Sequence, residues 1–163
     1  MDSNKSSRRS GFSLIEILVV LSVIGILSGF GIAKYNTYTQ QLILKNQARK
    51  IANIFELAKK KAVSAELYQD CADFQGYRIE TSTDNFSLLF NCGGVYTTVQ
   101  SFQMTSNITL LTGTGNSDFL PLGAGNNLMF NSLRLKNSKI NQCIDITISP
   151  IGILNINDTL ISC

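Results

Sequence analysis

Hydrophobic residues follow two different patterns along this chain, and the first of them lies near the N-terminus. From Phe12 to Ile32 the sequence is apolar apart from a few small residues and one charge, Glu16. About 20 apolar residues of helix are enough to cross the hydrocarbon layer of a bilayer. The pattern therefore predicts a membrane-spanning helix over residues 12–34, preceded by a short leader, residues 1–11.

The helical pattern continues past the apolar run without a break. Apolar residues recur at alternating steps of four and three, which places them on one face of a helix. This stripe consists of Leu44, Ala48, Ile51, Phe55, Ala58, Ala62 and Ala65. The opposite face carries Lys45, Asn46, Lys50, Asn53, Lys60 and Lys61. We predict an amphipathic helix over residues 35–68, ending near Leu67, and interpret Lys59–Lys61 as a solvated helix face.

Residues 69–163 form the second pattern, in which short alternating runs are separated by turn residues, as is typical of β-strands. The expected strands are 77–80, 86–90, 95–104, 108–111, 127–131, 144–148 and 153–156. The segment Thr112–Asn127 is rich in Gly, Asn, Thr and Ser and is expected to be a long exposed loop. The sequence thus predicts an α+β fold, with a long N-terminal helix packed against a small antiparallel β-sheet head.

The composition argues against catalysis and against a general affinity for nucleic acid. The net charge of +3 is concentrated in the leader, where Lys5, Arg8 and Arg9 face one acid, Asp2. The chain has no histidine, so the commonest general base and zinc ligand are missing, and its acidic residues are few and scattered. We therefore expect neither an enzyme, such as a membrane-anchored one with an external catalytic head, nor a metal site or a cofactor.

Four cysteines, Cys71, Cys92, Cys143 and Cys163, all follow the apolar run, and none forms a Cys-x-x-Cys pair. An even number without metal or redox spacing suits disulfides in an oxidising compartment, with four buried thiols in a cytosolic domain as the alternative. Local loop closure costs the least chain entropy, which favours Cys71–Cys92 and Cys143–Cys163 over the crossed or nested pairings.

Two ordinary interpretations of the N-terminal segment fit less well. A cleavable secretory signal has a shorter apolar centre, about 7–15 residues, and ends in a small-residue cleavage site. A plain signal anchor gives no reason for Glu16, because an ionisable group in the membrane costs about 2.5–3.5 kcal/mol and therefore indicates function. Glu16 could instead serve only as a carboxylate that the helix dipole favours near the N-terminus.

The segment around Glu16 resembles the processing motif of type IV prepilins and type II secretion pseudopilins. It reads Arg8-Arg9-Ser10-Gly11-Phe12-Ser13-Leu14-Ile15-Glu16, and the match extends through Ile17–Val20 and Gly25–Leu27. The resemblance implies that a membrane-embedded prepilin peptidase cuts between Gly11 and Phe12 and that the new amino group of Phe12 is N-methylated.

The same resemblance implies a role in filament assembly. Glu16 would pair with the Phe12 amine of a neighbouring subunit and set the register of a helical bundle, with residues 12–34 as the filament core. The implied partners are other pilin or pseudopilin subunits and the inner-membrane assembly platform. Before assembly the chain would be a single-pass inner-membrane protein with a cytoplasmic leader and a periplasmic head. Many family members have proline where this chain has Ala33, so local melting of the helix on assembly stays open.

The head is similar to the minor pseudopilin H and FimT type. The similarity covers Ala48–Val63 and a closing hairpin, Asp145–Leu154, in which Ser149-Pro150-Ile151-Gly152 joins two strands. It implies a minor pilin or pseudopilin for protein export or pilus biogenesis. The alternative is a FimT-like tip subunit that binds DNA for natural transformation, or one that captures exported protein through the Thr112–Asn127 loop. No Arg or Lys follows Lys139, which disfavours a basic DNA-binding tail and leaves Arg134, Lys136 and Lys139 as the nearest cations.

Overall fold

The structure is a computed structural model that describes residues 13–163, except for the side chains of residues 29–33. These residues form one long helix, α1 (Leu14–Val63), ten strands and one 3-10 turn. The strands are β1 (Phe74–Thr81), β2 (Asn85–Cys92), β3 (Val95–Gln103), β4 (Ile108–Thr112), β5 (Gly115–Phe119), β6 (Asn126–Leu128), β7 (Ser132–Asn137), β8 (Gln142–Ile148), β9 (Leu154–Ile156) and β10 (Ile161–Ser162), and the turn is η1 (Pro121–Gly123). The chain divides into two compact units, residues 1–38 and 39–163, and we call the second unit the head.

Helix α1 passes through Ala33 without interruption and ends earlier than the sequence suggested. We expected it to reach about Leu67, but the last helical residue is Val63 because Ala65 adopts a left-handed conformation with φ of 49°. The Ala65 N–H donates to the Ala62 carbonyl at 3.0 Å, and the Glu66 N–H donates to the Lys61 carbonyl at 2.9 Å. These two bonds form a Schellman motif in which alanine occupies the position where glycine is usual. Because the sequence has no glycine there, the end of the helix could not be predicted from residue type.

The predicted apolar stripe of α1 packs against the head. Its six members within the helix are fully or almost fully buried, namely Leu44, Ala48, Ile51, Phe55, Ala58 and Ala62. Phe55 meets Phe119 edge-on, with ring centroids 6.1 Å apart. Burial of this stripe rather than helix propensity stabilises the second half of α1, since most helical stability in proteins comes from tertiary packing.

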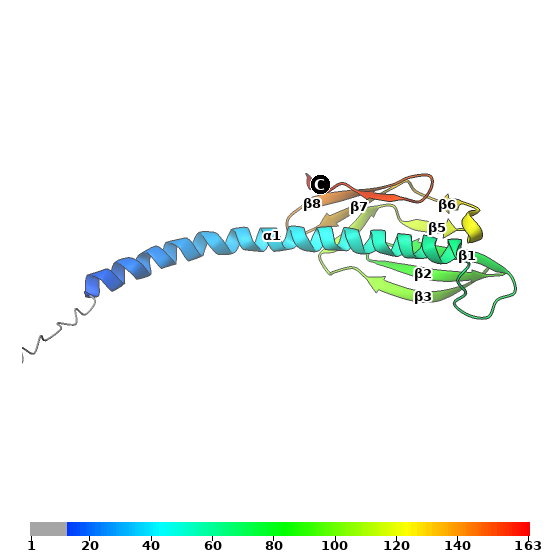
Figure 1. Ribbon diagram of the computed structural model, residues 1–163. Helices are drawn as coiled ribbons and strands as arrows, with labels where there is room; N and C mark the ends of the chain where they lie inside the picture. The colour runs from blue at the N-terminus through cyan, green and yellow to red at the C-terminus, as the bar shows by residue number, and fades with distance from the viewer. Residues whose placement is uncertain (1–12) are drawn as a thin grey trace, which may run out of the picture. The chain divides into compact units, whose positions relative to one another are not determined.

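The second half of α1 packs against two antiparallel sheets rather than one (Figure 1). Sheet A has the strand order β3-β2-β1-β5-β6, and sheet B has the order β10-β8-β7-β4, with β9 also paired to β8. Side chains from α1 and from both sheets form one hydrophobic core. The α+β fold with a helix packed on an antiparallel head is therefore confirmed, and the division of that head into two sheets is new.

The Thr112–Asn127 segment is not a long exposed loop. It contains β5, which pairs with β1 through Thr81↔Gly115 to Tyr77↔Phe119 and buries Ser117 and Phe119. Within β5, Gly115, Asn116 and Asp118 are half-buried, whereas Ser117 faces the core. Within the Thr112–Asn127 segment the chain is irregular only at residues 113–114 and 120–125, the second of which contains η1.

Two further strands, β7 and β10, were not expected. Strand β7 alternates, with Leu133 and Leu135 buried and Arg134 exposed, and it lies between β4 and β8 in sheet B. Strand β10 is only two residues long and pairs with the start of β8, through Ile161↔Cys143. A strand of that length has no periodicity, so its pairing depends entirely on tertiary context.

Both disulfides in the head have the pairing expected from local loop closure. Cys71 is bonded to Cys92, and Cys143 is bonded to Cys163. The first fastens the segment after α1 to the end of β2, and the second holds the C-terminal residue against β8. Each closes a loop of about twenty residues, a size for which chain-entropy models give about 3 kcal/mol of stabilisation.

Candidate functional site

The residues of the predicted processing motif lie at the edge of the described chain. Gly11 and Phe12 lie outside the described residues. Glu16 lies in the first turn of α1, where its N–H donates to the Ser13 carbonyl at 3.0 Å, and its side chain is exposed. A carboxylate at this position interacts favourably with the positive end of the helix dipole. The position also leaves the carboxylate free for a second, intermolecular partner.

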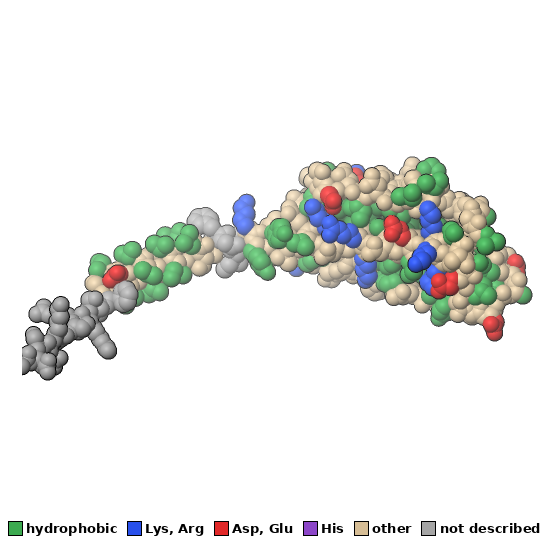
Figure 2. All heavy atoms as spheres, viewed as in Figure 1, with side chains coloured by type: hydrophobic (Ala, Val, Ile, Leu, Met, Phe, Trp, Pro, Cys, Tyr) green, Lys and Arg blue, Asp and Glu red, His purple; other side chains and the backbone are tan. Residues whose placement is uncertain are grey.

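Most of the helix surface around Glu16 is apolar, as the face drawn in Figure 2 shows. Eleven large apolar side chains between Leu14 and Leu27 are each between 49% and 80% exposed. A helix that is hydrophobic all round is normally buried, in a core or in a membrane. The helix surface from Leu14 to Leu27, which we call the apolar unit, is therefore expected to be buried against lipid or protein, with one acid, Glu16, among its apolar side chains.

The predicted membrane span, residues 12–34, overlaps the first part of α1. Among residues 13–163, with the side chains of 29–33 left aside, no helical stretch is both long enough and apolar enough to cross a bilayer. The predicted span includes Phe12 and the side chains of residues 29–33, which lie outside the described residues.

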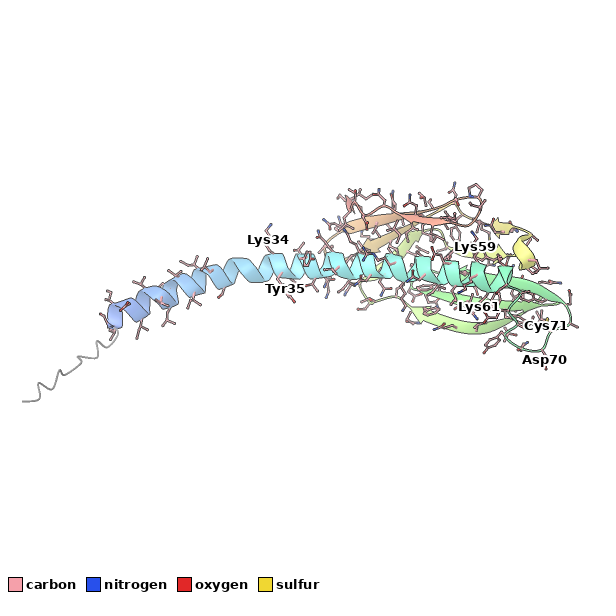
Figure 3. The ribbon with its side chains drawn as sticks, viewed as in Figure 1. Lys34, Tyr35, Lys59, Lys61, Asp70 and Cys71 are labelled. Carbon is pink, nitrogen blue, oxygen red and sulfur yellow. A yellow bond between two sulfur atoms is a disulfide. The ribbon has the colours of Figure 1, made fainter. Side chains whose placement is uncertain are left out.

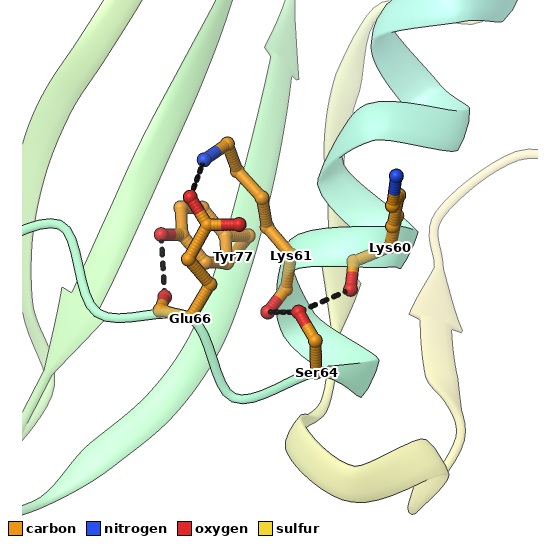
Figure 4. Close-up of polar contacts among 5 residues, drawn as sticks. All are labelled: Lys60, Lys61, Ser64, Glu66 and Tyr77. Atoms are coloured by element: carbon orange, nitrogen blue, oxygen red, sulfur yellow. Dashed lines mark hydrogen bonds and ion pairs between the residues drawn. The ribbon is translucent and has the colours of Figure 1, made fainter.

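Two of the lysines near the end of α1 contact neighbouring segments of the head (Figures 3 and 4). Lys59 Nζ donates to the Ile151 carbonyl at 2.7 Å, and Lys61 pairs with Glu66. The Tyr77 hydroxyl donates to the Glu66 carbonyl at 2.7 Å, and burial, followed by the nearby Glu66 charge, raises the pKa of Tyr77. Lys59 and Lys61 therefore contact neighbouring segments. Lys60 is exposed, as expected for a lysine on a solvated helix face.

The cations considered for DNA binding do not form a free cluster on sheet B. Arg134 donates to both oxygens of Asp145, at 2.6 and 2.8 Å, across the β7–β8 pair. Lys136 is half-buried and Lys139 is exposed. The bidentate pair neutralises Arg134, so this surface presents less positive charge than the sequence suggested.

The Arg134–Asp145 pair leads to a pH-dependent prediction. Hydrogen bonding to Arg134 lowers the pKa of Asp145 below its ordinary value. A depressed folded-state pKa contributes stability above the unfolded pKa, and that stability is lost as pH falls through the folded pKa. We expect Asp145→Asn to lower the melting temperature slightly at about pH 6 and to lower it less near pH 2, because the charge of the wild-type carboxyl is lost as pH falls through its folded-state pKa. Calorimetry at both pH values checks this, and an equal difference at the two pH values would contradict it.

The outer face of sheet A carries a cluster that the sequence did not reveal. Arg78 on β1 donates to both oxygens of Asp118 on β5, at 2.6 and 2.9 Å. The same guanidinium lies over the Tyr96 ring of β3, 3.9 Å from its centroid. Residues from three strands meet here because β5 lies beside β1 in sheet A. The cluster could not be predicted from a sequence in which β5 was expected to be a loop. In the part of the chain that the structure describes, no group of three or more Cys, Asp or Glu side chains is arranged to hold a metal ion.

Comparison with known proteins gives two matches. Residues 6–32 match the family model of the prokaryotic N-terminal methylation motif. The chain is also 33% identical over 81 residues to the type IV major alpha-pilin of Moraxella bovis, an alignment that covers 49% of this chain and 47% of that protein. Both matches support the pilin and pseudopilin family. The chain spans about half the length of the curated relative it matches, and no solved structure matches it significantly.

Proposed function

We propose that this chain is a structural subunit of a pilus-like filament, processed by a prepilin peptidase between Gly11 and Phe12 and N-methylated at Phe12. The observation that carries the proposal is the methylation motif at residues 6–32, within which the helix surface from Leu14 to Leu27 is apolar except for Glu16 and Ser22. Removing the leader would leave a charged amine on Phe12, next to that apolar surface. In this role the chain is a substrate of an enzyme and not itself a catalyst.

Before assembly, the apolar unit would lie in the inner membrane as a single span. The basic leader would stay cytoplasmic, following the positive-inside rule, and the head would lie outside the cytoplasm. Two disulfides in the head support that orientation, because such bonds persist in oxidising compartments. The inner-membrane assembly platform would then transfer the subunit to the filament, where neighbouring helices replace lipid around Leu14–Leu27.

Within this class we favour a minor pilin or pseudopilin of the H and FimT type. Support comes from the closing hairpin, in which β8 pairs with β9 through Ile148↔Leu154 across the Ser149–Gly152 turn. The Gly152 N–H donates to the Ser149 carbonyl at 2.8 Å and closes this turn. The alternative FimT-like role, DNA binding, gains no support from Arg134, whose guanidinium is held by Asp145.

The test is the intact mass of the full chain after co-expression with a prepilin peptidase. We expect loss of Met1–Gly11 and the addition of one methyl group to Phe12. Gly11→Glu should block both changes, because a bulky charged side chain would then flank the bond to be cut, while Gly25→Ala, a glycine change in the apolar helix with open space around it, should be processed normally. An uncut wild-type chain, or a cut well beyond Phe12, would overturn the proposal.

A further inference from the structure

The outer face of sheet A contains a groove of about 540 Å³, a size typical of small-ligand sites. Its lining comes from strands that include the start of β1 and the end of β5, and from η1. Figure 1 shows these elements at the end of the head where α1 terminates. The lining residues that matter for recognition are Phe74, Gln75, Asn91, Tyr96, Asp118 and Asn127. All of them belong to strands of sheet A, so the groove is part of the head alone.

Aromatic rings provide the apolar part of this groove. Phe74 is fixed by stacking on Phe90, with ring centroids 5.4 Å apart. Tyr96 is 37% exposed, and the Arg78 guanidinium that lies over it is itself held by Asp118. Neither ring has to be ordered when a ligand arrives, so little conformational entropy is lost on binding.

Amide side chains supply the polar part. Asn91 accepts a hydrogen bond from the Gly94 N–H at 3.0 Å, which fixes its oxygen and leaves its amino group to donate. Gln75 donates to Asp73 at 3.0 Å and keeps its oxygen as an acceptor. Asn127 is exposed at the opposite wall. Amides offer donors and acceptors together, which suits hydroxyl groups because each hydroxyl both donates and accepts.

The charges of the groove select against anions. Of the described residues that line it, Asp118 alone is charged, and Arg78 neutralises it through a bidentate pair. The neighbouring carboxylate of Asp73 leaves the rim weakly negative. Nucleic acid binding depends on cations that contact phosphates, and this lining offers no lysine.

The floor of the groove also disfavours an extended peptide. Strands β1, β2 and β5 lie inside sheet A, where their backbone groups already pair with neighbouring strands. Peptides that bind to sheets gain affinity by main-chain hydrogen bonds at an open edge. Here only side chains are available, and they combine apolar rings with uncharged amides.

We propose that this groove binds a neutral saccharide. The C–H surface of a sugar ring packs against Tyr96 and Phe74, and its hydroxyls bond to Asn91, Asn127 and the free lone pairs of Asp118. The Cys71–Cys92 disulfide lies next to Phe74, which pairs with Cys92 in the β1–β2 register, and it holds this wall in place. The inference concerns the head and is independent of leader cleavage.

The test uses the full chain in a detergent that carries no sugar headgroup. The protein is applied to an array of neutral, sialylated and sulfated oligosaccharides together with single-stranded DNA, and the best neutral ligand is then titrated by calorimetry. We expect binding to neutral saccharides that is unchanged between low and high salt, since no ion pair forms. Tyr96→Ala should weaken binding about three- to tenfold, the equivalent of an aromatic contact, and Asn127→Ala about two- to tenfold, the equivalent of one hydrogen bond.

Tyr38→Ala is the matched control, because it removes an exposed tyrosine ring that lies outside the head. Circular dichroism melts of Tyr96→Ala and Asn127→Ala verify that each variant is folded, and Asn127 is exposed enough to give a second readout if Tyr96→Ala unfolds. Three outcomes would each overturn the proposal: no neutral saccharide binds, DNA or acidic glycans bind instead, or the groove variants bind as tightly as Tyr38→Ala.

Discussion

Replacement of Glu16 by alanine is expected to leave leader cleavage intact and to abolish incorporation of the subunit into filaments. In the proposed assembly the Phe12 amine of one subunit is buried beside Glu16 of its neighbour. Removing one partner of a buried ion pair costs about 3–5 kcal/mol because the other charge is left unpaired. That corresponds to a loss of roughly two to four orders of magnitude in the assembly equilibrium. The measurement is the amount of subunit in sheared filaments, beside the intact mass of the membrane-bound pool.

The control for this experiment lies on the same helix. Glu56 is an exposed acid of α1 within the head, so Glu56→Ala removes a carboxylate of the same type without touching the apolar unit. Glu16→Gln keeps the shape and removes the charge, and it should assemble as poorly as Glu16→Ala. If Glu16 only interacts with its own helix dipole, all three variants will assemble nearly normally, because such an interaction is worth only about 0.3–1 kcal/mol.

The contrast between α1 and β5 shows how much of the fold could be predicted from the sequence. The stripe from Leu44 to Ala62 repeats over many turns, and each member is buried where the period placed it. Strand β5 has only Ser117 and Phe119 pointing inward, and it pairs with β1, a strand more than thirty residues earlier. Its partner, not its composition, makes it a strand, since β-propensity depends strongly on context. Strand β7 is a different case, because the alternation of Leu133 and Leu135 is visible in the sequence although it lies outside the strands that we expected.

The candidate sites divide in the same way. Glu16 could be identified because a single acid in a long apolar run is exceptional whatever the fold is. Arg78, Asp118 and Tyr96 are ordinary residues in the sequence, and they form a groove wall only because β1, β5 and β3 belong to one sheet. The disulfides were predictable because local closure is the cheapest pairing in chain entropy, and Cys71–Cys92 and Cys143–Cys163 both obey that rule.

The second large effect is expected at Gly76, in the strand that supports the groove. Its φ is +113°, and a Cβ at this position would lie 2.0 Å from the Phe119 carbonyl oxygen. Gly76→Ala therefore combines a backbone conformation that alanine avoids, costing about 1–3 kcal/mol, with overpacking that costs about 1–3 kcal/mol more. Because the clashing atom belongs to the β5 backbone, the β1–β5 pairing must shift to relieve the contact. We expect the melting temperature of the full chain to fall by on the order of 10 °C, as measured by calorimetry.

Gly125→Ala separates the two causes. Gly125 has nearly the same positive φ, +118°, but a Cβ there would meet nothing within 4 Å. It should therefore lose only the backbone contribution, about 1–3 kcal/mol, and melt well above Gly76→Ala. Equal losses in the two variants would mean that backbone conformation alone makes glycine necessary and that β1 and β5 do not approach closely at Phe119. A larger loss at Gly76 would instead show that this contact sets the spacing of the strands that carry Arg78 and Asp118.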